Sequence, residues 1–181
     1  MAVHSQVAGT DSSETFYYVM RCLIVVFLLL SVVAVITAQP VAIDSVKNKR
    51  ILLGKVTQAN IADSIWYRKN YGLEMVSAEE LNTISKFSNE VTIEVYFGTW
   101  CDDSRYWVPA FIGLIDKTEL ADQVSLMAVP RSKKTSETVK LKEIIERVPT
   151  FIFWREGQEI GRIVETPEVS LAEDMIRIIR Q

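Results

Sequence analysis

The segment from Val91 to Ser104 constrains the fold of this chain more than any other part of it. Residues 91–97 read VTIEVYF, a run rich in β-branched and aromatic residues that predicts a strand. Gly98 opens a tight loop that ends in Trp100 and Cys101, and we expect a helix over residues 102–117. Cys101 therefore stands where a strand turns into the first turn of a helix.

Patterns on both sides of this segment predict further strands and helices. A capping box formed by Ser77 and Glu80 opens one helix, and Ser170 with Glu173 opens the last one. The remaining elements are predicted from apolar periodicity and turn signals: strands over residues 51–56, 124–129, 151–154 and 159–164, of which the last two form a hairpin, and helices over 60–70 and 139–147. This order predicts an α/β domain, with a central mixed sheet covered by helices on both faces and a C-terminal hairpin plus helix.

Composition bounds the partners and the chemistry. The chain has 181 residues and a net charge of −3, with acidic and basic residues interspersed, so it presents no basic surface for nucleic acid. Its one histidine is His4, far upstream of the folded region, which argues against Ser-His-Asp and Cys-His mechanisms. Histidine is also the commonest nitrogen ligand of zinc, so we expect no metal site and no cofactor.

The first 50 residues differ in character from the rest. Residues 22–38 read CLIVVFLLLSVVAVITA without a charge, which is typical of either a signal peptide or a short membrane anchor. Residues 1–21 form a polar N-terminal tail, in which Met20 is an alternative translation start. Residues 39–50 are predicted to be a linker, and residues 51–181 the folded domain.

Two arguments about localisation point in opposite directions. The apolar run is short and N-terminal, which favours export and an extracytoplasmic domain, either periplasmic or secreted. Basic residues follow the run at Lys47, Lys49, Arg50 and Lys55, whereas only Arg21 precedes it. For an uncleaved anchor held in the membrane by residues 22–38, that bias favours a cytoplasmic-facing domain. We expect export, with the cytoplasmic-facing anchor as the alternative.

Three features in order resemble the thioredoxin family. The pair Trp100-Cys101 lies at the first strand-to-helix turn, Pro109 follows eight residues later inside the helix, and Val148-Pro149 precedes the hairpin. The resemblance covers residues 91–179, and more loosely the chain from residue 51. It implies a thioredoxin fold, a cis peptide bond before Pro149, a reactive Cys101, and partners that are protein thiols or disulfides.

The chain departs from the family at the second redox position. Family oxidoreductases carry Cys-x-x-Cys, whereas residues 101–104 read Cys-Asp-Asp-Ser, and the only other cysteine is Cys22 in the apolar run. The expected catalytic residues are Cys101 as nucleophile and Ser104, whose hydroxyl is placed to donate a hydrogen bond to the sulfur. Because serine cannot resolve a mixed disulfide, an external thiol such as glutathione, or the substrate's second thiol, must do so.

The resemblance also implies a substrate-binding surface. Trp100 and the residues Val148, Pro149 and Thr150 are expected to lie beside Cys101, where an extended peptide pairs with the backbone by strand addition. The sequence thus predicts a thiol exchange protein that acts through one cysteine on protein or small-molecule disulfides. The alternative is a redox-inactive thioredoxin-fold interaction module, with or without a membrane tether.

Overall fold

The structure is a computed structural model that describes residues 16–17, 20–21, 41–44, 46–134 and 145–181. The chain divides into two units, residues 1–38 and 39–181. In the first unit, the four described residues are helical and exposed. The apolar run 22–38 lies outside the described residues, so the signal peptide or anchor and the localisation stay predictions. Within the described ranges, no helix is long and apolar enough to span a membrane.

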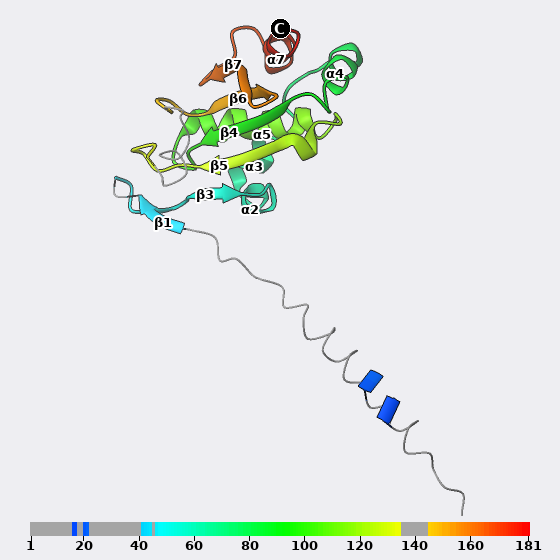
Figure 1. Cartoon of the computed structure of the whole chain (residues 1–181). Helices are drawn as coiled ribbons and strands as arrows, with labels where there is room; N and C mark the ends of the chain where they lie inside the picture. The colour runs from blue at the N-terminus through cyan, green and yellow to red at the C-terminus, as the bar shows by residue number, and fades with distance from the viewer. Residues whose placement is uncertain (1–15, 18–19, 22–40, 45, 135–144) are drawn as a thin grey trace, which may run out of the picture. The chain divides into compact units, whose positions relative to one another are not determined.

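A five-stranded mixed sheet forms the centre of the second unit (Figure 1). Its strands lie in the order β3 (Gly54–Val56), β5 (Val124–Ala128), β4 (Thr92–Phe97), β6 (Thr150–Arg155) and β7 (Gln158–Val164). β4 is central, parallel to β5 and antiparallel to β6. β3 and β7 complete the two edges in antiparallel pairing.

Helices cover this sheet around a large apolar core. The contributing helices are α2 (Ala59–Ala62), α3 (Ile65–Asn70), α4 (Ala78–Ser85), α5 (Asp102–Ile115) and α7 (Leu171–Ile179). Their buried side chains pack with those of β4 and β6 in one cluster. A smaller cluster around Tyr96 and Ile152 contains the other set of β4 and β6 side chains, as the alternation of a strand requires. The strand order, the C-terminal hairpin and the final helix confirm the predicted thioredoxin fold.

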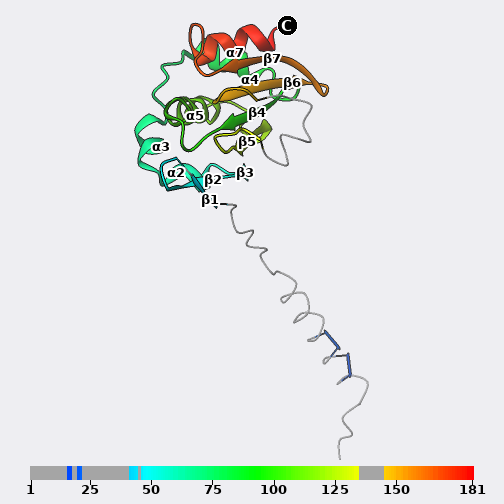
Figure 2. The same ribbon diagram turned by 90° about the vertical axis from the view of Figure 1, so that its left-hand side faces the viewer.

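The N-terminal part of this unit differs from the prediction. Residues 39–50 were expected to be a linker, but β1 (Val41–Asp44) and β2 (Lys49–Leu52) form an antiparallel pair. The expected strand over 51–56 is divided between β2 and β3, because Gly54 has a φ of 74° and bends the chain. Figures 1 and 2 show this hairpin beside β3, whereas α7 packs against β7 at the other edge.

Two predicted helices also differ. The helix expected over 60–70 is divided into α2 and α3, because Ser64 is extended, with a ψ of 138°. The helix expected over 139–147 falls mainly on residues 135–144, which lie outside the described residues, and residues 145–147 are not helical. A short 3₁₀ helix, η1 (Ala121–Gln123), precedes β5. The capping box at Ser77 is confirmed, with both of its reciprocal hydrogen bonds present.

Candidate active site around Cys101

Cys101 is the N-cap residue of α5. Its backbone is extended, its own N–H donates to the Gly98 carbonyl at 2.9 Å, and its carbonyl accepts from the Arg105 N–H at 3.1 Å. These two bonds close the tight turn after β4 and begin the helix. The thiol is free and half-buried, so a nucleophilic sulfur is presented at a helix N-terminus with access to solvent.

The segment before β6 lies directly against the sulfur. The Val148–Pro149 peptide bond is cis, as predicted, and the Cys101 Sγ–H donates to the Val148 carbonyl at 3.3 Å. The Pro149 carbonyl accepts from the Glu165 N–H at 2.7 Å. Thr150 is buried and its hydroxyl donates to the Arg147 carbonyl, so its side chain contributes to the packing and hydrogen bonding of the fold. Of the predicted substrate-binding segment, the Val148 backbone is the part closest to the thiol.

Ser104 has a different role from the one expected. Its side chain is 1% exposed, and its Oγ accepts a hydrogen bond from the Gly98 N–H at 3.2 Å. The expected hydrogen bond to the Cys101 sulfur is not among the contacts of this hydroxyl in the described part of the chain. Ser104 therefore ties the first turn of α5 to the end of β4 and fixes the loop that carries the thiol.

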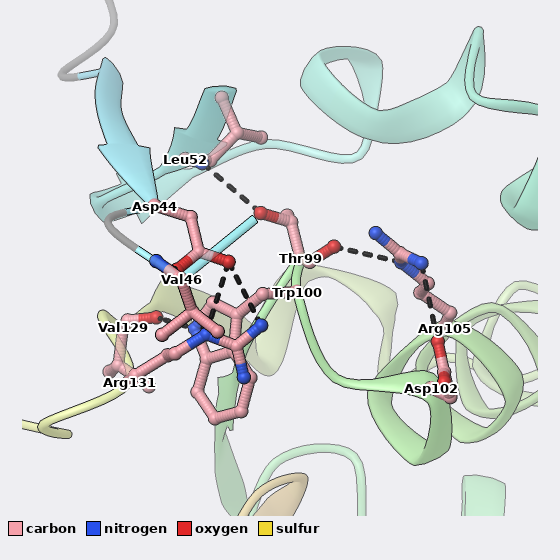
Figure 3. A network of polar contacts seen from close by, with 9 residues as sticks. All are labelled: Asp44, Val46, Leu52, Thr99, Trp100, Asp102, Arg105, Val129 and Arg131. Atoms are coloured by element: carbon pink, nitrogen blue, oxygen red, sulfur yellow. Dashed lines mark hydrogen bonds and ion pairs between the residues drawn. The ribbon is translucent and has the colours of Figure 1, made fainter. Parts of the chain in front are cut away.

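Trp100 is held on several sides. Its Nε1–H donates to the Val129 carbonyl at 2.8 Å. Its ring packs so closely on Gly98 that a Cβ at that glycine would lie 2.5 Å from the indole. On another side, the Arg131 guanidinium carbon lies 4.7 Å from the ring centroid, in a cation–π contact (Figure 3). The indole beside the thiol therefore has a fixed orientation.

A buried ion pair supports this arrangement from the N-terminal hairpin. Asp44, at the end of β1, has a side chain that is 2% exposed, and both of its oxygens accept from the Arg131 guanidinium at 2.9–3.0 Å. The Arg131 hydrogen bond is the main cause that lowers the pKa of Asp44. The same bond is the main cause that raises the pKa of Arg131. Arg131 thus places a positive charge over Trp100, the residue next to the candidate nucleophile.

A second arginine fixes the other side of the loop. Arg105 donates through Nε to the Thr99 carbonyl at 2.8 Å and through Nη1 to Asp102 at 3.2 Å. The Thr99 hydroxyl oxygen accepts from the Leu52 N–H at 3.2 Å, which joins the loop to β2 (Figure 3). The active-site loop is therefore connected to both strands of the N-terminal hairpin.

Sequence reasoning did not identify Asp44, Arg105 or Arg131 as parts of this site. Asp44 and Arg131 are 87 positions apart, and each stands in a segment expected to be polar and irregular. The available signal was weak: both are charged residues that end a short run of apolar residues. By contrast, Trp100, Cys101 and Val148 were predicted, and the structure brings all three into one cluster.

Two cavities lie near these elements. One, of about 270 Å³, is formed by β2, α2, the start of α3, Thr99 and Arg105, and borders the active-site loop. The other, of about 420 Å³, lies between β3, β5 and the C-terminal half of α5, and is not lined by residues 98–104. Within the described ranges, no group of three His, Cys, Asp or Glu side chains is placed to hold a metal ion.

Comparison with known proteins gives one relative in sequence. A thioredoxin-like protein of Acanthamoeba polyphaga mimivirus is 27% identical over 107 residues, which cover 55% of this chain and 76% of the viral protein. This similarity supports a thioredoxin-like family for the chain. No family model matches it. A thioredoxin-like assignment agrees with the strand order, with Cys101 at the start of α5 and with the cis bond before Pro149.

Solved structures with a similar backbone path have low sequence identity to this chain. A protein of unknown function from Pseudomonas aeruginosa is 14% identical, with a TM-score of 0.49, and the match covers 70% of this chain and 92% of that one. Thioredoxin from Malassezia sympodialis is 19% identical, with a TM-score of 0.38, covering 58% and 88%. Thioredoxin from Trypanosoma brucei brucei is also 19% identical, with a TM-score of 0.34, covering 62% and 94%.

Proposed function

We propose that this chain exchanges thiols and disulfides through Cys101 alone, on protein or small-molecule disulfides. The observation that supports this is the position of the Cys101 sulfur: half-buried at the N-terminus of α5 and 3.3 Å from the Val148 carbonyl. The thioredoxin-like similarity supports thiol–disulfide exchange as the general chemistry. That the exchange uses Cys101 alone goes beyond this similarity and is part of the proposal.

In the first step, the Cys101 thiolate attacks one sulfur of a substrate disulfide. The substrate S–S bond breaks, a mixed disulfide forms with Cys101, and the second substrate sulfur leaves as a thiolate that takes up a proton. The unpaired N–H groups and dipole of the α5 N-terminus favour negative charge on the attacking sulfur. The Arg131 guanidinium, whose carbon lies 4.7 Å from the centroid of the neighbouring Trp100 ring, supplies a positive charge in the same surroundings.

In the second step, the mixed disulfide is resolved from outside. The domain holds no second cysteine, and Ser104 is buried against the Gly98 amide. An external thiol such as glutathione attacks the substrate sulfur or the Cys101 sulfur and so breaks the mixed disulfide. If the thiol displaced in the first step attacks instead, the original disulfide re-forms; if a different thiol of the same substrate attacks, the substrate disulfide is rearranged and Cys101 leaves as a thiolate, without net oxidation or reduction.

The substrate approaches next to the Val148 backbone and the Trp100 ring. Both belong to the cluster that contains Cys101, and the orientation of the ring is fixed by Val129 and Arg131. An extended peptide that pairs beside Val148 would bring its disulfide to the sulfur. In this proposal, Trp100 and Val148 orient the substrate, and Pro149 and Thr150 set the course of the chain between Val148 and β6.

One contact favours the alternative of a redox-inactive interaction module. The Cys101 Sγ–H donates to the Val148 carbonyl, and this bond exists only while the thiol is protonated. A carbonyl oxygen directly beside the sulfur also repels a thiolate. If this contact outweighs the helix N-terminus and Arg131, the same surface binds partner peptides without exchanging disulfides.

Mass spectrometry under non-reducing conditions separates these two functions. The reduced full-length protein is incubated with two peptides joined by one disulfide, in the absence of small thiols, so that the displaced peptide diffuses away. We expect a persistent mixed disulfide on Cys101 that is released by glutathione, no adduct with Cys101→Ser, and an unchanged adduct with Cys22→Ser as the matched cysteine control. Absence of the adduct, with peptide binding retained, would make the interaction module the better function.

A further inference from the structure

The cavity of about 270 Å³ beside the active-site loop has no role in the chemistry proposed above. Thr99, in its wall, lies two residues before Cys101, and Arg105, also in its wall, donates its backbone N–H to the Cys101 carbonyl. The volume is slightly below the range of about 300–1,000 Å³ typical of sites for drug-sized ligands. It therefore suits a group of the size of one side chain.

The polar atoms that line this cavity are mainly hydrogen-bond donors. The Asn60 side-chain oxygen already accepts from the Thr57 N–H at 2.6 Å and from the Thr57 hydroxyl at 2.9 Å. The Thr99 carbonyl already accepts from the Arg105 Nε–H. The Asn60 amide NH₂ and the indole N–H of Trp66 are donors only, and the hydroxyls of Ser64 and Thr99 can donate as well. A ligand that fits this wall must bring acceptors.

The charged residues of the lining also favour a ligand that brings hydrogen-bond acceptors. Arg50 and Arg105 both line the cavity, and no aspartate or glutamate is among its lining residues. The two hydrogen bonds of Arg105 to Thr99 and Asp102 use Nε and Nη1, which fixes the plane of the guanidinium and leaves the donors of Nη2. Fixed guanidinium groups are the preferred partners of carboxylates in proteins.

Apart from the Ser64 hydroxyl, the rest of the lining is apolar. Its residues come from β1, β2, α2 and α3 and are Val41, Ile51, Leu52, Ile61 and the ring of Trp66. Apolar side chains form one part of this wall and hydrogen-bond donors form another. A small, fully hydrated anion is therefore disfavoured, because it would lose water on the apolar side without gaining contacts there. The wall favours a carboxylate at the end of a short apolar stem.

We propose that this cavity is a binding subsite for a carboxylate on an apolar stem. Such a group occurs in free carboxylic acids and in the acidic side chains of polypeptides. That the subsite selects substrates for Cys101 rests on the function proposed above, whereas the binding of a carboxylate does not. Cys101 is not among the lining residues, so a ligand here would contact the active-site loop at Thr99 without covering the thiol.

Titration of the full-length protein with hexanoate, followed by the backbone amide NMR signals of Ser64 and Thr99, tests the binding. We expect saturable shifts at these two amides, and about tenfold weaker binding of hexanamide, which has the same stem without the charge. Arg50→Gln should weaken hexanoate binding by at least about threefold. Lys49→Gln, which removes the same charge from the neighbouring position of β2, should change it less than about twofold.

Equal binding of hexanoate and hexanamide would overturn the proposal, as would equal weakening by Arg50→Gln and Lys49→Gln.

Two disulfide peptides that differ only in one glutamate or glutamine then distinguish the sources of the carboxylate. Tighter binding of the glutamate peptide, reversed by hexanoate, assigns the subsite to polypeptides. Equal binding of both peptides, with hexanoate bound, assigns it to small carboxylic acids. Neither readout requires Cys101 to react, so a failed exchange assay leaves the subsite unaffected.

Discussion

At the scale of single residues, hydrogen bonds to the backbone fix the active-site loop. Ser104 accepts from the Gly98 N–H, Trp100 donates to the Val129 carbonyl, and Arg105 donates to the Thr99 carbonyl. Each bond satisfies a loop group that would otherwise be buried without a partner. Ser104, one turn after Cys101, is therefore part of this support, and replacing it tests both the loop and the chemistry.

Ser104→Cys should shorten the lifetime of the mixed disulfide on Cys101. The new thiol stands one helical turn from the mixed disulfide and attacks it internally, which the serine hydroxyl cannot do. The decay of the adduct, followed by mass spectrometry without small thiols, measures the lifetime. Ser104→Ala is the control: it should leave the lifetime unchanged but lower the free energy of unfolding by about 1–2 kcal/mol, because the Gly98 N–H loses its acceptor. A Ser104→Cys adduct that decays no faster would contradict the single-cysteine cycle.

The residues of the site were predictable only where a local pattern marks them. Cys101 follows a strand and precedes a helix, so the sequence pattern located it, whereas the part of Pro149 in the site was expected from the resemblance to the thioredoxin family. Asp44 and Arg131 form their ion pair across 87 positions, and neither lies in a motif. A long-range contact between two isolated charges leaves no periodicity in the sequence, so their part in holding Trp100 became visible only in the structure.

At the scale of elements, α5 depends on a close approach to the chain between α3 and α4. Nine of its residues are buried, and Gly113 faces the backbone of Gly72. A Cβ at Gly113 would lie 2.4 Å from the Gly72 nitrogen and 2.7 Å from its Cα. Because both are backbone atoms, a side-chain rotation cannot relieve the overlap.

Gly113→Ala should therefore destabilise the protein although alanine is the better helix former. Helix propensity favours alanine by about 1 kcal/mol, but overpacking against backbone costs about 1–3 kcal/mol. We expect a net loss in the free energy of unfolding, measured by urea denaturation. Asn82→Ala, at an exposed position of α4, isolates the propensity effect and should be neutral or slightly stabilising. A gain in stability for Gly113→Ala equal to that of Asn82→Ala would show that the two segments separate easily.

The ion pair that joins Asp44 of β1 to Arg131 should be sensitive to acid. Arg131 lowers the pKa of Asp44 below its ordinary value of 3.8. The folded state thus favours the carboxylate, so this contribution to stability is complete above pH 3.8 and is lost as the pH falls below it. We expect amide hydrogen exchange in β1 and β2 to accelerate in that acidic range.

Asp44→Asn should produce the faster exchange of β1 and β2 already at neutral pH, because Arg131 then has no charged partner. Asp63→Asn is the matched control, since the ion pair of Asp63 with Arg68 is long, at 3.8 Å, and fully exposed. If both variants exchange like the wild type, the Asp44–Arg131 pair does not hold the hairpin.

At the scale of the whole molecule, the fold was predictable because its central units are local in sequence. β4 leads directly into α5, and β6 and β7 are joined by the turn at Glu156 and Gly157. The N-terminal part was not predictable, because β1 and β2 have only four residues each, and Lys49 and Arg50 make half of β2. What orders this hairpin is its contacts with residues far along the chain, and not its own pattern.

The whole domain should lose stability in alkali through Tyr67. This residue of α3 is buried and its hydroxyl oxygen accepts from the Gln58 amide at 2.8 Å. Burial raises its pKa to about 12, so the folded state favours the neutral phenol. The contribution to stability is therefore complete below pH 10, the ordinary value, and is lost as the pH rises towards about 12.

Urea denaturation at pH 9 and at pH 11 measures this dependence. We expect the free energy of unfolding to fall between these values in the wild type, and to fall less steeply in Tyr67→Phe, which has no ionisable group there. Tyr106→Phe, on the exposed side of α5, should retain the wild-type dependence. The same slope in all three proteins would mean that other groups cause the alkaline loss.

The hairpin of β1 and β2 determines where this chain can be shortened or cleaved. A fragment that begins at Ile51 keeps the whole five-stranded sheet but lacks Asp44, so Arg131 loses the buried partner that holds it over Trp100. Removal of a leader after Ala38 would leave that support intact, whereas a protease cut only 12 residues later would remove it. Two products that differ by so short a peptide would share a fold and differ at the surface around Cys101.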